Sequence, residues 1–164
     1  MISIPDFLHK TNMLVFKKLS LEIKSVYLEK ESADYNACQL LLNDKKILFR
    51  TAKTTPTKIG QFVTLWKRTE NGPIAPFAIE DGFDLVIINT ETENYFGQFV
   101  FPTAILLEKA VFSTDLKEGK RAIRVYPPWD KTTSKQAQKT QQWQLEYFIE
   151  IPFEKDKIQK LYQL

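Results

Sequence analysis

FDLVIINTETENYFGQFVFP, residues 83–102, is the stretch that decides the fold. Two runs rich in β-branched and aromatic residues, 83–91 and 95–102, flank a short polar segment, and this pattern predicts two neighbouring strands. Asp84 stands at the start of the first run, where a charged side chain can reach solvent while the residues after it enter a sheet. The fold is therefore expected to be built around a β-sheet.

Further strands are predicted on both sides of this pair. Residues 35–52 contain two β-rich runs around Asn43-Asp44, whose side chains favour turns, so they predict a hairpin. Residues 59–69 predict another strand, which ends at the ENGP break of residues 70–73. Residues 121–127 alternate apolar and polar side chains and predict a strand with one basic face.

Apolar residues at helical spacing predict helices around these strands. The first begins at Asp6, and the others cover residues 104–110, 131–148 and 154–164. The first helix has an apolar face of Phe16, Leu19, Ile23, Val26 and Tyr27, and the last packs through Ile158, Leu161 and Tyr162. This order of elements predicts an α/β (α+β) fold with a central mixed sheet flanked by helices, in a single domain of residues 1–164.

Composition narrows the class of protein. The 164 residues are 43% hydrophobic and 26% charged, which is typical of one soluble domain, and the net charge is only +3. Cys38 is the sole cysteine, which excludes an internal disulfide and a cysteine-rich zinc site and suits a reducing compartment. The chain has neither a signal-like N-terminus nor an apolar run of membrane-spanning length. We therefore expect a cytoplasmic protein without a membrane partner.

Cationic side chains are concentrated in residues 50–68, RTAKTTPTKIGQFVTLWKR, which contain no carboxylate. Charge and neutral hydroxyls together suit phosphate groups, and neighbouring aromatic rings suit bases. The pattern therefore predicts a nucleic-acid-binding surface, with the choice between DNA and RNA open. The candidate contacts are Arg50, Lys53, Thr54, Thr55, Thr57, Lys58, Trp66, Lys67 and Arg68, extended by Arg121, Arg124 and Trp129 from a second basic group.

Most enzyme templates are missing from the sequence. Neither glycine-rich phosphate loop occurs, and His9 is the only histidine, which leaves no histidine-based triad or multi-histidine metal site. Carboxylate chemistry with Mg²⁺ remains possible, because one or two acidic side chains can hold this ion beside a phosphate. Asp84 is the best single candidate for such a ligand.

Four blocks of the sequence closely resemble the MepB family of small bacterial proteins. They are AKTTPTKIGQFVTLWKR, GQFVFP, GKRAIRVYPPWD and KQAQKTQQWQLEYF, and the resemblance extends from about Tyr35 to Phe148. The family takes its name from a gene beside a multidrug efflux pump and its regulator. The resemblance implies a fold similar to that of PD-(D/E)xK nuclease-like domains, which have a restriction-endonuclease-like core.

The nuclease motif is incomplete when it is transferred to this chain. Asp84 fits the first acid, but Gln98 stands in place of the second acid and Val100 in place of the lysine. Losing a carboxylate and the lysine should cripple hydrolysis. Thr103 also replaces a lysine expected after GQFVFP, which removes one cation from the predicted surface.

Three interpretations follow. The leading one is a nucleic-acid-binding protein with a degenerate nuclease-like fold, without a cofactor and with at most weak catalysis. The second is a metal-dependent nuclease in which Asp84 and Gln98 hold Mg²⁺. The third is a binder of small molecules or proteins associated with multidrug resistance. The oligomeric state stays open.

Overall fold

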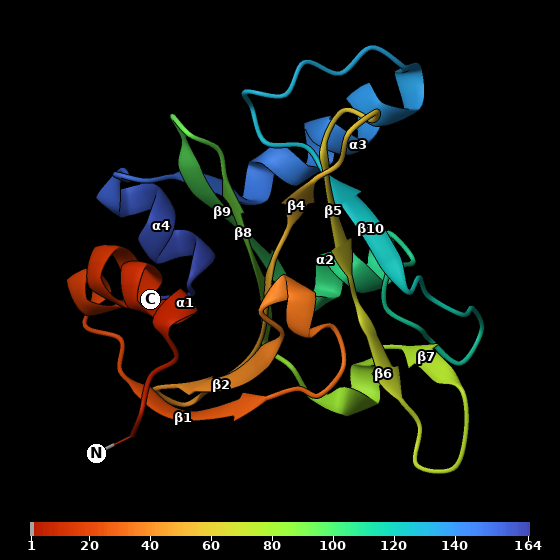
Figure 1. Ribbon diagram of the computed structural model, residues 1–164, viewed down its shortest axis with the longest axis horizontal. Helices are drawn as coiled ribbons and strands as arrows, with labels where there is room; N and C mark the ends of the chain where they lie inside the picture. Colours follow the sequence, from red (N-terminus) through yellow and green to blue (C-terminus); the bar gives the residue numbers. More distant parts are fainter. Residues whose placement is uncertain (1) are drawn as a thin grey trace.

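A six-stranded sheet forms the centre of the protein in the computed structural model, which describes residues 2–164 (Figure 1). Its strands are β1 (Ile23–Leu28), β2 (Cys38–Leu42), β3 (Lys45–Thr51), β8 (Leu85–Glu91), β9 (Phe96–Pro102) and β11 (Phe148–Glu150), which lie side by side in this order. β3 and β8 run parallel, whereas the other neighbouring pairs are antiparallel. The sheet is therefore mixed, as the sequence predicts.

Two smaller sheets and four α-helices are attached to this centre in residues 2–164. A three-stranded sheet contains β10 (Ala122–Val125), β5 (Gln61–Thr64) and β4 (Lys53–Thr54) in that order, and β6 (Trp66–Arg68) pairs with β7 (Ile74–Pro76). The helices are α1 (Asp6–Thr11), α2 (Thr103–Glu108), α3 (Lys135–Gln144) and α4 (Lys155–Leu161). A π-helical turn covers Asn12–Phe16, and 3-10 turns cover Lys17–Leu19, Ala33–Tyr35, Ile79–Asp81 and Leu145–Tyr147.

The two faces of the central sheet are covered by different layers. Leu85 and Ile87 of β8 belong to an apolar cluster that includes residues of α1 and α4. Val86 and Ile88, which alternate with them, belong to a second cluster with residues of β5, β10 and α2. Figure 1 shows α1 and α4 on one side of the sheet and the three-stranded sheet on the other. The predicted arrangement of a mixed sheet flanked by helices is confirmed.

Several predicted elements are confirmed individually. Residues 83–102 form the antiparallel pair of β8 and β9, and residues 35–52 contain the β2–β3 hairpin. Asn43, in the hairpin turn, has a φ of 55°, a left-handed conformation that asparagine tolerates better than most residues. The short helix predicted at 104–110 and the terminal helix predicted at 154–164 correspond to α2 and α4.

The helix predicted from Asp6 is wrong beyond Leu19. Ser20 takes a left-handed φ of 58° and ends the helical segment, and the chain then forms β1, which pairs with β2. Ile23 and Val26 are β-branched and fit a strand as well as a helical face, so their spacing does not discriminate between the two. The helix predicted at 131–148 is also too long. The structure has α3 only over Lys135–Gln144 and begins β11 at Phe148.

A chain of hydrogen bonds runs across the face of the central sheet that α1 and α4 cover, from Thr11 at the end of α1 to Tyr162 just after α4. The Tyr162 hydroxyl donates to Gln98 Oε1 at 2.7 Å, and Gln98 Nε2 donates to Asn89 Oδ1 at 2.8 Å. Asn89 Nδ2 in turn donates to Thr11 Oγ1 at 2.7 Å. All four side chains are buried, so this polar chain satisfies groups that would otherwise be costly inside the core.

Each helix within residues 2–164 is too short or too polar to cross a lipid bilayer.

Candidate nucleic-acid interface

A row of cations and aromatic rings crosses one face of the three-stranded sheet. The strand register pairs Phe62 of β5 with Lys53 of β4 on one side and with Arg124 of β10 on the other. Directly paired residues on neighbouring strands project to the same face, so these three side chains stand in one line. The Tyr35 ring extends the line, because its centre lies 6.2 Å from the Phe62 ring centre and 5.1 Å from Lys53 Nζ.

This row lies on the outer face of the sheet. Gln61, Val63 and Val125, which alternate with the row along the same strands, are buried on the opposite face. Lys53 is exposed, whereas Phe62 and Arg124 are half-buried. The Arg124 Cζ atom lies 5.7 Å from the Phe62 ring centre. The outer face therefore presents cations that are held close to aromatic rings but remain accessible.

The loop between β4 and β5 bends over this face and is fastened by Arg124. Arg124 Nη2 donates to Thr55 Oγ1 at 2.8 Å, and Nη1 donates to the Gly60 carbonyl at 3.3 Å. Gly60 has a φ of 88°, and a Cβ atom there would lie 2.6 Å from the Tyr126 ring, so the loop needs glycine at this point. Thr57 and Lys58 stay exposed in the loop, close in sequence to these anchors.

Three predicted contacts are charged and without a carboxylate partner in residues 2–164. Ion pairs in this part of the chain do not include Lys53, Lys58 or Arg124. Thr57 is exposed beside them, and Thr55 is half-buried and accepts the Arg124 hydrogen bond. Thr54 pairs with Gln61, so its side chain projects to the opposite face from the row. The structure therefore brings together, from two distant segments, five of the residues that the sequence assigns to one surface: Lys53, Thr55, Thr57, Lys58 and Arg124.

Arg50 is a correction, because its side chain is wholly buried and cannot reach a phosphate. Its guanidinium forms an ion pair with Glu29, and Nη2 lies 3.2 Å from Glu29 Oε1. Arg50 Nε also donates to the Thr64 carbonyl at 3.0 Å. These contacts join β3 of the central sheet to β5 of the small sheet. Arg50 thus holds β5, the strand that carries Phe62, against the central sheet, and its side chain is not part of the row.

Three further predicted cations are paired with acidic side chains. Lys67 Nζ lies 2.7 Å from Asp81 Oδ1, Arg68 Nε lies 2.7 Å from Glu31 Oε1, and Arg121 Nη2 lies 2.8 Å from Glu118 Oε1. The hydrogen bond to Glu31 raises the pKa of the Arg68 guanidinium above its ordinary value. Their charge is partly neutralised, so they contribute less to a phosphate surface than Lys53, Lys58 and Arg124 do.

The predicted tryptophans lie outside the row. Trp129 stacks on Tyr95 with ring centres 5.0 Å apart and also packs edge-on against Phe148. Its ring is therefore engaged with other aromatic side chains. Trp66 lies in β6, a different sheet, where its ring centre is 5.8 Å from Arg68 Cζ. The aromatic rings closest to the free cations are those of Phe62 and Tyr35.

Asp84 and Gln98 are not brought together. Asp84 precedes β8, where Leu85 pairs with Pro102, whereas Gln98 pairs with Asn89 four positions further along β8. At about 3.3 Å per strand residue, the two lie roughly 16 Å apart along the ladder. Asp84 Oδ2 accepts a hydrogen bond from the Lys46 backbone N–H at 2.8 Å, and Gln98 belongs to the polar chain. They cannot share one Mg²⁺ ion.

Other clusters of metal ligands are also missing from the described part of the chain. Within residues 2–164, no group of three or more His, Cys, Asp or Glu side chains is placed to hold a metal ion. Cys38, the sole thiol, is buried in the core beneath α1 and α4. Burial is the main cause that raises the pKa of its thiol to about 12, and the nearby Glu29 charge adds to it.

Sequence reasoning missed the two aromatic members of the row. Phe62 lies inside the predicted strand 59–69, and Tyr35 lies at the start of the predicted hairpin, but neither stood out as a site residue. The only available signal was the alternation along 61–64, which places Phe62 and Thr64 on one face. The pairing of Phe62 with both Lys53 and Arg124 depends on strand register, which the sequence alone leaves open.

Comparison with known proteins gives three findings. Residues 29–150 match the family described as MepB-like. The crystal structure of MepB is similar to this chain, with a TM-score of 0.79 and 36% identity over 89% of this chain and 99% of that one. A bacterial homing endonuclease has a TM-score of 0.49 and 14% identity over 85% of this chain and 88% of that one, too distant to transfer fold or activity. Among curated proteins, none matches this sequence.

Proposed function

We propose that this chain, which belongs to the MepB-like family, binds nucleic acid through the outer face of its three-stranded sheet. The observation that carries the proposal is the row in which Lys53 and Arg124 flank Phe62. Both cations are free of carboxylates within residues 2–164, and the net charge of the chain is only +3. Attraction for a polyanion therefore has to come from a local surface such as this one.

Phosphates are the proposed targets of the cations and hydroxyls. Lys53 and Lys58 contribute exposed ammonium groups, and Arg124 offers a guanidinium that is hydrogen-bonded to the loop. Thr57 adds a neutral donor, which positions a backbone without reading sequence. An interface of this kind distinguishes poorly between base sequences and depends strongly on salt.

Bases are the proposed partners of the rings. Phe62 and Tyr35 lie next to the cations and are half-buried, so each keeps part of its surface accessible. Stacking on such rings contributes about 1–3 kcal/mol per base in single-strand-binding proteins. We therefore expect single strands to bind more tightly than duplexes, while the choice between DNA and RNA rests on the experiment below.

A metal-dependent nuclease is the weaker proposal. It requires ligands that meet at one point, and Asp84 and Gln98 lie at different levels of the β8–β9 ladder. The surface proposal needs no cofactor, because its contacts are charge, hydrogen bonds and stacking. A cleavage assay with Mg²⁺ and labelled DNA or RNA, using Asp84→Ala as the control, tests the nuclease proposal directly.

The decisive experiment is fluorescence anisotropy of labelled single- and double-stranded DNA and RNA over a salt series. The test variant is Lys53→Ala/Lys58→Ala, and the matched control is Lys155→Ala/Lys157→Ala, which removes the same charge from α4 on the opposite side of the central sheet. Each phosphate contact contributes about 0.9 to the slope of log affinity against log salt on duplex DNA. The test variant should lose affinity and slope, whereas the control should retain both.

Two results would overturn the proposal. One is the absence of binding to any of the four substrates at low salt. The other is an equal loss of affinity in the two double variants, because that would show a response to net charge alone.

A further inference from the structure

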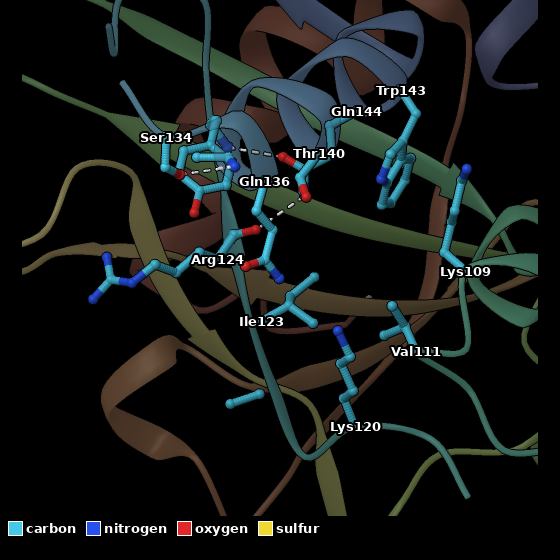
Figure 2. A pocket seen from close by; sticks show the side chains of 13 residues that line it. Lys109, Val111, Lys120, Ile123, Arg124, Ser134, Gln136, Thr140, Trp143 and Gln144 are labelled. Atoms are coloured by element: carbon cyan, nitrogen blue, oxygen red, sulfur yellow. Dashed lines mark hydrogen bonds between the residues drawn. The ribbon is translucent and has the colours of Figure 1, made fainter. Parts of the chain in front are cut away.

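A groove separate from the row lies between β10 and α3. Its volume is about 420 Å³, and residues of β10, α3 and the segment around Val111 line it. Figure 2 shows Ile123 near the middle, with Thr140 and Trp143 on the helix side, Lys109 next to Trp143, and Lys120 on the side opposite the helix. The Arg124 side chain extends away from Lys109 and Trp143, so the groove and the row use different sides of β10.

The groove combines positive charge with an apolar wall. Thirteen residues line it, all within residues 2–164, and none of them is acidic. Lys120 is free of ion pairs in this part of the chain, whereas Lys109 Nζ lies 3.9 Å from Glu108 Oε2 and 5.6 Å from the Trp143 ring centre. Ile123 and Trp143 supply the apolar surface. A ligand that fits must combine a flat apolar part with negative charge.

Backbone groups of β10 face this groove. Leu65 N–H donates to the Arg121 carbonyl at 2.8 Å, which fixes the phase of the β5–β10 ladder. Hydrogen-bonded and non-hydrogen-bonded pairs alternate in an antiparallel ladder, so Ala122 and Arg124 turn their N–H and C=O groups away from β5. β10 is the edge strand of its sheet, and both residues line the groove.

The free part of this edge is short because both of its ends are occupied. At one end, Gln144 Nε2 donates to the Arg124 carbonyl at 2.9 Å and Gln144 Oε1 accepts from Tyr126 N–H at 2.9 Å. At the other end, Lys120 N–H donates to the Val111 carbonyl at 2.8 Å. Three neighbouring groups remain without a partner in residues 2–164: the N–H and C=O of Ala122 and the N–H of Arg124.

An extended peptide does not suit the free part of the β10 edge. Strand addition draws its affinity from a run of main-chain hydrogen bonds. The free part of the β10 edge offers only three backbone groups, because the groups on either side already bond to Gln144 and Val111. A small planar ligand with a hydrogen-bond donor beside an acceptor suits it well. The Watson–Crick edge of a nucleobase has this pattern, and adenine presents an N6 donor next to the N1 acceptor.

We propose that the groove binds a nucleotide, with its base edge on the free backbone of β10 and its phosphate between Lys109 and Lys120. Adenine N6–H would donate to the Ala122 carbonyl, and N1 would accept from Arg124 N–H. Trp143 and Ile123 provide the apolar wall for the ring. This site goes beyond the phosphate surface proposed above, because it lies on the other side of β10 and binds its ligand independently. The nucleotide is either free or an unpaired residue of a nucleic-acid strand.

The test is a titration of the full chain with AMP in which calorimetry measures the binding. Adenosine and ribose 5-phosphate serve as partial ligands, since one lacks the phosphate and the other lacks the base. The test variant is Lys120→Glu, and the matched control is Lys117→Glu, which reverses the charge of an exposed lysine in the same connection that does not line the groove. Lys53→Ala/Lys58→Ala is added to separate this site from the row.

Saturable AMP binding that weakens at least tenfold in Lys120→Glu and persists in Lys117→Glu is the expected result. Adenosine and ribose 5-phosphate should each bind more weakly than AMP. Unchanged AMP binding in Lys53→Ala/Lys58→Ala would keep this proposal standing even if the surface proposal fails.

A second titration, with a single-stranded dA oligonucleotide, identifies the source of the nucleotide. Affinity much higher than that of AMP, and sensitive to Lys120→Glu, assigns the groove to an unpaired base in a strand, whereas equal or lower affinity assigns it to a free nucleotide. The proposal is overturned if neither probe binds, or if the two lysine variants behave alike.

Discussion

Glu29 accepts hydrogen bonds from the guanidinium of Arg50, a side chain from which solvent is fully excluded. The pair lies beneath the row, because Arg50 also donates to the Thr64 carbonyl of β5. A residue that the sequence assigns to the binding surface thus fixes the sheet that carries this surface.

Removing the acid from this pair should destabilise the fold strongly. Glu29→Ala leaves the Arg50 charge buried without its partner, which typically costs about 3–5 kcal/mol in the free energy of unfolding. Urea denaturation measures the change. Glu31→Ala is the control, because its partner Arg68 is exposed and little stability should be lost. Similar losses in the two variants would contradict the structural role of the buried pair.

Glycine at position 60 should be required for the loop over the row. Gly60→Ala adds a Cβ atom 2.6 Å from the Tyr126 ring and forces alanine into a φ of 88°. The conformational cost alone is about 1–2 kcal/mol, and the clash should displace the loop that carries Lys58. Gly82→Ala separates the two effects, because its φ is 76° but nothing lies within 4 Å of the added atom. Thermal unfolding should show a larger loss for Gly60→Ala, and a larger loss for Gly82→Ala would refute the packing argument.

The Tyr162 hydroxyl should contribute to stability through the polar chain. Tyr162→Phe leaves Gln98 Oε1 buried without a donor, and such a loss costs about 1–3 kcal/mol. Chemical denaturation at neutral pH measures it. Tyr27→Phe is the matched control, since the Tyr27 side chain is exposed on β1. Equal stabilities of Tyr162→Phe and the unmodified chain would show that Gln98 finds another donor.

Cys38 should be inert in the native state and should make stability depend on alkaline pH. Burial raises the pKa of the thiol from 9.0 to about 12, so the unfolded chain loses this proton first as the pH rises. Native-state stabilisation by the neutral thiol is therefore complete below pH 9 and is lost between pH 9 and 12. The measurement is the urea midpoint at pH 8 and pH 10.5, compared with Cys38→Ala, whose midpoint should fall less.

A thiol reagent supplies an independent check of the same residue. At pH 8 the folded protein should react far more slowly than the urea-unfolded protein, because both the thiolate fraction and access are low. Rapid labelling of the folded protein would mean that the core around Cys38 opens readily.

Much of the fold can be predicted from the sequence because its central strands are continuous runs of β-branched and aromatic residues bounded by turn residues. The runs at 83–91 and 95–102 and the Asn43-Asp44 turn predict elements that the structure contains. Residues 23–28 are different, since Ile23 and Val26 satisfy a helical face as well as a strand. Only pairing with β2, a tertiary contact, decides between the two.

The site residues are harder to predict from the sequence, because the acidic partners of the cations come from distant segments. Residues 50–68 contain no carboxylate, but Arg50 finds Glu29 and Arg68 finds Glu31, both upstream of the hairpin. A local absence of acidic residues therefore does not predict free cations. Within residues 2–164, Lys53 and Arg124 form no ion pair because β4, β5 and β10 contain no acidic residue, and Lys58 lies in the loop that Arg124 holds.

The polar chain that joins Thr11 to Tyr162 also sets the order in which its hydrogen bonds can form while the protein is synthesised. Thr11 lies in α1, which is synthesised before every strand of the central sheet, and Tyr162 follows all of these strands. Asn89 and Gln98 are made between them and must wait for the last donor before their hydrogen bonds are complete. One face of the sheet therefore stays exposed to solvent and to chaperones during synthesis. It is covered only when the segment that contains Tyr162 has been made.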